Sequence, residues 1–143
     1  MACFLSSDNK EFISPQGSNA ILSKDGKTLI LSCRSTIIPE GVEVIGDNAF
    51  MGRYSQLFLR IPENVHTIGC GAFKSCNNLF ELEIRQSVQL IDSEAFSHCL
   101  NLKTVLLKTS VDAISSNTFS HFYNLTNVNL PENGENDTQL CFQ

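Results

Sequence analysis

One phrase of 23 residues is repeated four times between Ile45 and Leu130, with no insertion or deletion. Each copy opens with an isoleucine and has a phenylalanine five positions later. The four pairs are Ile45 and Phe50, Ile68 and Phe73, Ile91 and Phe96, and Ile114 and Phe119. Further aliphatic residues follow each Phe at nine and eleven positions. A fixed period in the twenties predicts a solenoid, in which successive copies form stacked turns of similar shape.

A single copy of the phrase has too little apolar surface to fold by itself. Its large apolar side chains, about five per copy, contribute on the order of 10 kcal/mol when buried, at ~1.5–3 kcal/mol each. Ordering the backbone of one copy costs on the order of 25–45 kcal/mol, at ~1–2 kcal/mol per residue. The turns must therefore stack, so that each Phe packs on the next Phe and each strand pairs with its successor.

The second half of each copy predicts a short parallel strand. In Leu79-x-x-Leu82-x-Ile84 the apolar residues alternate, so one side of the strand faces the core. A proline comes directly after this strand pattern in two copies, at Pro62 and Pro131, and at Pro39 in a partial earlier copy. Because proline cannot donate a hydrogen bond to a neighbouring strand, we expect it to end the strand.

Two ladders of residues should point outward from these strands, eight and ten positions after each Phe. They consist of Phe58, Glu81, Thr104 and Asn127, and of Arg60, Glu83, Leu106 and Asn129. Phe58 and Leu106 are apolar where the pattern asks for polar residues, and an apolar anchor beside Arg and Glu suits a protein interface. These residues are the candidate protein-binding site, on the inner face of the curve. Alternatively, the N-terminal loop or hairpin covers Phe58.

The repeat has a family resemblance. The phrase Ile38-Pro-Glu-Gly-Val-Glu-Val-Ile-Gly-Asp-Asn-Ala-Phe50, followed by Ile68-Gly-x-Gly-Ala-Phe-x-x-Cys-x-x-Leu79, resembles the BspA-like leucine-rich repeat family over residues 36–131. The resemblance implies a leucine-rich repeat solenoid of the α/β horseshoe type. It would have a parallel β-sheet on its concave side and short strands, turns or 3₁₀ segments on its convex side. Members resemble one another as surface or secreted adhesion modules of anaerobic bacteria and parasitic protists, and some bind host matrix proteins.

The chain departs from the family pattern at a few positions. At Gln56 the leading Leu of the strand is displaced to Leu57, and Thr118 replaces the usual Ala. The family's Cys is absent at Arg53 and Phe122. Because the repeat motif is architectural, the resemblance carries over no catalytic or binding residue.

The residues before the repeats predict a β-hairpin. Residues 20–23 and 28–31 flank Lys24-Asp-Gly-Lys27, and Asp-Gly suits a tight turn. A similar element often precedes the repeats in the family, and it would cap the apolar end of the first turn. Residues 8–19 are polar and read as a loop. We therefore assign a loop and capping hairpin to residues 1–35, repeats to 36–131 and a polar tail or cap to 132–143, all in one structural domain.

Both ends of the chain leave alternatives open. Gly134 and Asp137 stand where Val and Ile are due, so either Leu140, Cys141 and Phe142 fold back as a cap or the chain continues into further repeats. Residues 1–7 are too short and uncharged for a signal peptide. Either the protein is cytosolic or the sequence is a piece of a longer chain.

The cysteines predict buried thiols more than disulfide bonds. Cys76 and Cys99 occupy the same place in successive copies, where a small apolar side chain would pack. Stacked positions ~5 Å apart can in principle be bridged, so a disulfide stays an alternative. The remaining cysteines lie outside the repeated pattern and would be reactive if exposed. They are Cys3, Cys33, Cys70 and Cys141.

Neither the histidines nor the asparagines predict a functional site. His98 and His121 should stack across adjacent turns on the outer side, without the third ligand that a metal site needs. Glycosylation sequons begin at Asn124 and Asn136. The first is better explained by the fold, because asparagines such as Asn101 fill the same place in other copies. We therefore expect no enzyme, no metal and no cofactor.

Composition limits the class of partner. A chain of 143 residues that is 42% apolar suits one domain, and its net charge of −5 argues against a nucleic-acid partner. No apolar run is long enough to cross a bilayer, so we expect no membrane insertion. We predict a non-catalytic module that binds a protein ligand, such as a host or matrix protein, at the cell surface or after secretion, as part of a longer chain. The alternative is a cytoplasmic scaffold, which free thiols favour.

Overall fold

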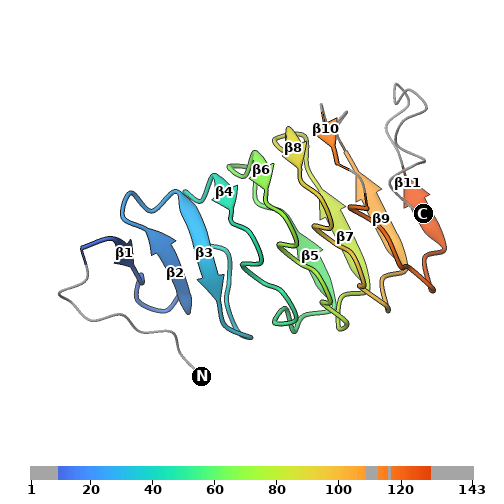
Figure 1. Ribbon diagram of the computed structural model, residues 1–143, viewed down its shortest axis with the longest axis horizontal. Coiled ribbons are helices and arrows are strands. Elements are labelled where there is room, and N and C mark those ends of the chain that lie inside the picture. The colour runs from blue at the N-terminus through green and yellow to red at the C-terminus, as the bar shows by residue number, and fades with distance from the viewer. Residues whose placement is uncertain (1–9, 109–112, 116, 130–143) are drawn as a thin grey trace.

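The computed structural model of the chain describes residues 10–108, 113–115 and 117–129. Within these ranges the chain forms strands and turns in two sheets, and no helix. The expectations for residues 1–7 and 132–143 lie outside the described residues, as do Cys3, Cys141 and the sequon at Asn136. Figure 1 shows the strands side by side in rows that follow the chain from its N-terminal to its C-terminal end.

The first sheet contains one short strand from each copy of the repeat, together with the N-terminal strands. Its order is β1-β2-β3-β4-β6-β8-β10. The repeat strands are β4 (Val44–Ile45), β6 (Thr67–Ile68), β8 (Leu90–Ile91) and β10 (Ala113–Ile114). They pair in parallel, with each isoleucine opposite the isoleucine of the next copy. The sequence period is therefore also the pairing register.

The second sheet contains the longer strands of the repeat, in the order β11-β9-β7-β5. These strands are β5 (Phe58–Arg60), β7 (Glu81–Ile84), β9 (Thr104–Leu107) and β11 (Asn127–Asn129). All pairs are parallel, and Leu59 lies opposite Leu82, which lies opposite Val105. The predicted parallel strands and their register are confirmed.

The core between the two sheets is built on a column of phenylalanine rings. The rings of Phe50, Phe73, Phe96 and Phe119 are fully buried. Successive ring centroids lie 4.8, 5.2 and 5.5 Å apart, and the planes are within 10° of parallel. The predicted stacking of each Phe on the Phe of the next turn is confirmed.

The phenylalanines sit at a corner that carries its own inter-turn hydrogen bonds. The backbone N–H of Phe50 donates to Ala72 O (2.8 Å), and that of Phe73 donates to Ala95 O (2.7 Å). The chain can turn here because residues two before and two after each Phe have positive φ angles. These residues are Asn48 and Gly52, Gly71 and Ser75, Glu94 and His98, and Asn117 and His121. The corner thus forms a third hydrogen-bonded side of the solenoid.

The N-terminal residues form a hairpin that continues the first sheet. Strands β2 (Ala20–Ser23) and β3 (Thr28–Ser32) pair antiparallel, and β3 pairs in parallel with β4. The turn is closed by a hydrogen bond from Gly26 N to Ser23 O (2.8 Å). Strand β1 (Phe12–Ile13) pairs with β2, so the expectation of a loop throughout residues 8–19 is wrong at this point. The capping role and the domain boundaries stay predictions.

Tyr54 explains how the first copy tolerates its departures from the pattern. Leu57 does not replace the missing leading leucine, because it is 63% exposed. Tyr54 is instead 9% exposed, and its ring packs edge-on at 5.8 Å from Phe50 and 5.9 Å from Phe73. Its hydroxyl donates to Phe58 O (3.0 Å). The copy that lacks the leading leucine at Gln56 therefore has an additional buried aromatic side chain, which packs on the phenylalanine column.

Candidate protein-binding face

The parallel register brings the predicted site residues together on one face of the four-stranded sheet. Phe58, Glu81, Thr104 and Asn127 lie opposite one another in sequence along one row, and Arg60, Glu83, Leu106 and Asn129 along the next. Phe58, Arg60, Asn127 and Asn129 are exposed, and Glu81, Thr104 and Leu106 are half-buried. The face thus presents both ladders, with one exception.

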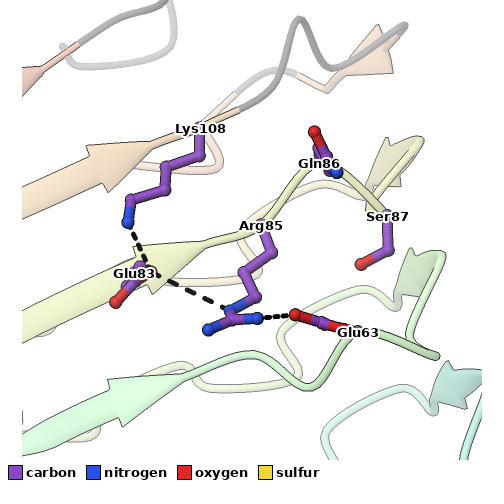
Figure 2. A pocket seen from close by; sticks show the side chains of 6 residues that line it. All are labelled: Glu63, Glu83, Arg85, Gln86, Ser87 and Lys108. Carbon is purple, nitrogen blue, oxygen red and sulfur yellow. Dashed lines mark hydrogen bonds and ion pairs between the residues drawn. The ribbon is translucent and has the colours of Figure 1, made fainter.

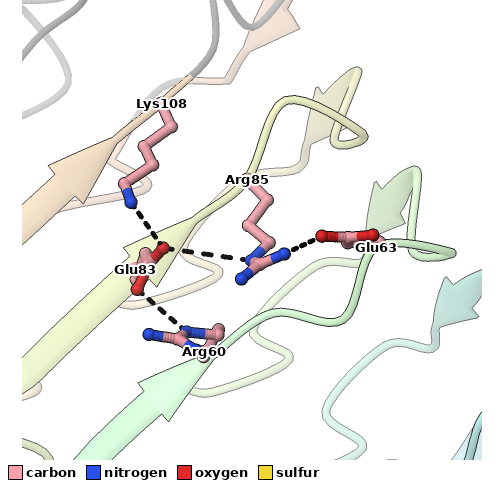
Figure 3. A network of polar contacts seen from close by, with 5 residues as sticks. All are labelled: Arg60, Glu63, Glu83, Arg85 and Lys108. Atoms are coloured by element: carbon pink, nitrogen blue, oxygen red, sulfur yellow. Dashed lines mark hydrogen bonds and ion pairs between the residues drawn. The ribbon is translucent and has the colours of Figure 1, made fainter.

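The exception is Glu83, which is only 4% exposed and does not lie open to solvent as the alternation suggested. Arg60 Nε lies 2.9 Å from Glu83 Oε2, and Lys108 Nζ lies 2.9 Å from Glu83 Oε1. Arg85 Nε lies 3.9 Å from the same Oε1, as Figure 3 shows. Long cationic side chains from three successive turns therefore cover a carboxylate that points outward from the sheet.

The cations also keep this carboxylate charged. Hydrogen bonding to Lys108 and then to Arg60 lowers the pKa of Glu83 below its ordinary value, against the opposing effect of burial. A buried carboxylate with charged hydrogen-bond donors is far less costly than an unpaired one. Glu83 is therefore an internal anchor that positions the three cations.

A pocket of about 540 Å³ opens beside this network, next to the ends of β7 and β9 (Figure 2). The described residues that line it are Glu63, Glu83, Arg85, Gln86, Ser87 and Lys108. Arg85 Nη1 donates to Glu63 Oε1 across the pocket. Sequence reasoning missed this pocket because it followed residues within the strands, whereas Arg85 and Lys108 come just after them.

Exposed apolar residues lie at the starts of β5 and β7, the opposite end of the sheet from the pocket. Leu57 and Phe80 occupy equivalent places in successive copies, just before β5 and β7, and both are exposed. Phe58 is 39% exposed beside them, so the hairpin and the described part of the N-terminal loop do not bury it. The Arg60 guanidinium lies 5.6 Å from the centroid of the Phe58 ring, and Lys103 Nζ lies 5.2 Å from that of Phe80. Cations therefore flank the exposed apolar surface.

The cysteines behave in two ways. Cys76 and Cys99 are buried free thiols, as predicted, and each Sγ lies 3.2 Å from a backbone carbonyl oxygen, of Phe50 and of Phe73 respectively. Burial raises the pKa of both thiols, so they are poor nucleophiles. Cys70 is free and half-buried. Cys33 is disulfide-bonded, so the expectation of a reactive thiol is wrong at that position.

Two further expectations about repeated side chains are confirmed. The rings of His98 and His121 stack with centroids 4.1 Å apart. Asn124 Nδ2 donates to Leu100 O (2.7 Å), just as Asn101 Nδ2 donates to Asn77 O (2.7 Å). Asn124 therefore has a structural role in the repeat. The described residues contain no group of three or more His, Cys, Asp or Glu side chains arranged to hold a metal ion.

The stacked parallel strands, the phenylalanine column and the open sheet face define a leucine-rich repeat solenoid. Within that class, the chain belongs to the BspA type leucine-rich repeat family, whose model matches residues 30–143 as six copies. The span is consistent with the partial earlier copy at Ile38 and Val42, both packed in the core. No curated protein matches the chain. Among the described residues there is no helix long and apolar enough to cross a membrane.

Solved structures with the same fold come from bacterial proteins. A leucine-rich repeat protein from Eubacterium ventriosum is 26% identical with a TM-score of 0.76, over 86% of this chain and 34% of that one. The T. pallidum leucine-rich repeat protein is 25% identical with a TM-score of 0.63, over 80% of this chain and 58% of that one. A leucine-rich cell surface protein from Faecalibacterium prausnitzii is 27% identical with a TM-score of 0.51, over 90% of this chain and 45% of that one. The chain therefore spans between about a third and three fifths of these relatives.

Proposed function

We propose that the chain is a non-catalytic module that binds a protein partner through the concave face formed by its four-stranded sheet. Leucine-rich repeat proteins are generally protein-interaction modules, and the chain belongs to such a family. The observation that carries the proposal is the set of exposed apolar residues at the starts of β5 and β7, namely Leu57, Phe58 and Phe80, with Arg60 and Lys103 over the two rings. Aromatic and arginine side chains dominate the binding energy of protein interfaces.

The eight residues of the two ladders have different parts in this proposal. Phe58 and Arg60 provide the anchor, and Glu81, Thr104, Leu106, Asn127 and Asn129 extend the surface along the sheet. Glu83 acts through the side chains that cover it, because its own carboxylate is buried beneath them. Shape and side-chain choice along the strands would then select the partner.

The proposed site of action is the cell surface or the extracellular medium, with a host or matrix protein as the partner. The disulfide at Cys33 supports this location, since disulfides persist mainly outside the reducing cytosol. The similarity to a cell surface protein from F. prausnitzii points the same way. The second candidate is an intracellular scaffold, which the free thiols of Cys70, Cys76 and Cys99 favour.

Labelling of intact source cells separates the two locations. A membrane-impermeant amine reagent is applied to whole cells, the protein is recovered, and lysines such as Lys74 and Lys103 are examined for the tag by mass spectrometry. The surface proposal predicts tagged lysines in intact cells. Tagging only after lysis would exclude the adhesion role and move the search to cytosolic partners.

Binding to immobilised host matrix proteins tests the face itself. Phe58→Ala should weaken capture at least tenfold while the melting temperature changes little. Arg60→Ala should weaken capture as well, but it should also lower the melting temperature, because it removes a partner of the buried Glu83 carboxylate. Met51→Ala is the control, because Met51 is an exposed apolar residue at the phenylalanine corner, away from the proposed face. Equal losses for Phe58→Ala and Met51→Ala would show that this face is not the binding surface.

A further inference from the structure

Residues that recur in every copy of the repeat serve its architecture. One recurring position, which holds proline in three copies, holds a different residue in two successive turns. The sequence position that follows the second core aliphatic residue of each strand pattern is Pro39, Pro62 and Pro131 in three copies, but Arg85 and Lys108 in the two between. β7 and β9 run four residues each, one more than β5, and Lys108 N donates to Ile84 O (2.9 Å), a bond that proline could not make. The backbone thus tolerates the replacement of proline by another residue. It does not explain why the two replacements, Arg85 and Lys108, are both long cations.

Both side chains line the pocket, where several buried polar atoms make no well-formed hydrogen bond among the described residues. They are Ser87 Oγ, Arg85 Nε and Glu83 Oε1, although Lys108 Nζ lies 2.9 Å from this Glu83 oxygen. Leaving a buried polar group unpaired destabilises a protein, and such groups in native proteins usually meet a water, an ion or a ligand. Glu83 does not supply the acceptor for Arg85, because its Oε1 lies 3.9 Å from Arg85 Nε, which is too far for a hydrogen bond.

Glu63 shows which chemical group the pocket accepts. Its carboxylate pairs with Arg85 from the neighbouring turn, but its side chain is 76% exposed, whereas that of Arg85 is 28% exposed. An ion pair with one partner this exposed contributes little to stability, so the glutamate can leave at little cost. The planar guanidinium then offers paired donors that match the geometry of another carboxylate.

We propose that this pocket binds a carboxylate group of the protein partner, which replaces Glu63 on Arg85 and is held in addition by Lys108 and Ser87. The inference rests on the proposed protein-binding function and specifies its chemistry: an acidic group of the partner enters beside the sheet face. Glu63 acts as an internal competitor for this site. Its removal should therefore strengthen binding, whereas removal of Lys108 should weaken it.

Sodium acetate is the probe, because it carries the carboxylate alone and requires no identified partner. Acetate is titrated at constant ionic strength into ¹⁵N-labelled protein, and NMR follows the Arg85 side-chain Nε–H signal and the backbone amides of Ser87 and Lys108. We expect saturable shifts at these groups. Glu63→Gln should tighten binding at least threefold, and Lys108→Gln should weaken it at least threefold.

Glu94→Gln is the matched control, since Glu94 pairs with Lys74 at the phenylalanine corner and its neutralisation changes the net charge equally. This variant should bind acetate as the parent protein does. Equal gains for Glu63→Gln and Glu94→Gln would reduce the effect to net charge and overturn the proposal. So would the absence of shifts at Arg85 and Ser87, or tighter binding of inorganic phosphate than of acetate.

Two related probes distinguish the possible sources of the carboxylate. N-acetylaspartate N-methylamide mimics an acidic side chain, and N-acetylglycine mimics a chain terminus. The probe that binds more tightly identifies the source of the partner's carboxylate. Because none of these probes involves the partner, acetate binding can succeed while matrix capture fails. That result would leave the pocket intact and reject the proposed partner class, whereas capture without acetate binding would reject only the pocket.

Discussion

The phenylalanine column and the charged pocket lie in the same repeats but follow opposite rules. In the column every copy supplies the same residue, and the rings stack with nearly constant spacing along the whole row. At the pocket the equivalent position changes from Pro62 to Arg85 to Lys108. A uniform column stabilises any number of turns, whereas a feature confined to two turns marks one place along the solenoid. Identity between copies therefore reports packing, whereas the departure at this one position is what the proposed carboxylate site explains.

The largest expected loss of stability comes from a substitution in the phenylalanine column. Phe96→Ala should reduce the free energy of unfolding by ~3–5 kcal/mol, because it removes a fully buried ring that stacks on Phe73 and Phe119 and leaves a cavity. Urea unfolding followed by circular dichroism measures the change. Phe80→Ala is the control, since Phe80 is exposed and should cost much less. A loss below ~1 kcal/mol for Phe96→Ala would contradict the repeat register.

The next effect concerns the anchor of the charged network. Glu83→Gln should lower stability at pH 7 by ~1–2 kcal/mol, because three cations lose the carboxylate that they surround, although two of them remain largely solvated. The folded-state pKa of Glu83 is lowered, so its contribution is present above the unfolded-state value of about 4.3 and is lost as the pH falls through the folded-state pKa. Melting temperatures of parent and variant should therefore converge in acid.

The comparison of column and pocket also explains how far the sequence predicts the molecule. The period alone located the paired strands, the stacked rings and the buried thiols Cys76 and Cys99, because these features depend on the same backbone geometry in every turn. Strand alternation likewise placed Phe58 and Asn127 on one face. Such predictions succeed where burial follows from the position of a residue in the repeat.

The rest depended on long side chains that reach across turns. Alternation assigned Glu83 to the solvent side but could not show that Arg60 and Lys108 fold over it. The compensating role of Tyr54 was hidden because its ring packs between two turns of the column rather than at a repeated core position. The one signal available for the pocket was the replacement of proline by Arg85 and Lys108. That signal becomes informative only when departures from a repeat are examined as closely as its matches.

A smaller effect tests the adaptation of the first copy. Tyr54→Phe keeps the ring but removes the hydroxyl that donates to Phe58 O, so it should cost ~0.5–1.5 kcal/mol at neutral pH. Burial raises the pKa of Tyr54 to about 12, above the unfolded-state value of about 10. The neutral phenol therefore adds stability below pH 10 that is lost between pH 10 and 12. The advantage of the parent over the variant should therefore disappear within that interval.

Tyr123→Phe provides the control for the alkaline experiment. Tyr123 occupies the equivalent place in the last copy, but its side chain is exposed. Its replacement should change neither the neutral stability nor the alkaline dependence. If Tyr54→Phe and Tyr123→Phe behave alike, Tyr54 does not perform the packing role assigned to it in the first copy.

The smallest effect compares one corner position in two turns. Gly52 (φ 65°) and Ser75 (φ 59°) both have left-handed backbone conformations two residues after a phenylalanine of the column. Glycine adopts this conformation without steric cost, whereas other residues pay ~1–2 kcal/mol, partly offset by the greater backbone entropy of glycine in the unfolded chain. Gly52→Ala should therefore destabilise the protein by ~0.5–1 kcal/mol, and Ser75→Gly should stabilise it by about 0.5 kcal/mol.

These two variants separate the contribution of backbone conformation to stability from that of side-chain packing. A Cβ atom added at Gly52 would meet no atom within 4 Å, so a loss of stability there cannot come from a clash. Urea unfolding of both variants, measured in parallel with the parent protein, gives the sign of the change in the free energy of unfolding for each. Opposite signs for the two variants mean that the corner conformation itself limits which residues each copy can use. Equal signs would mean that the turns have relaxed differently around Phe50 and Phe73, and the corner would then be as variable as the pocket.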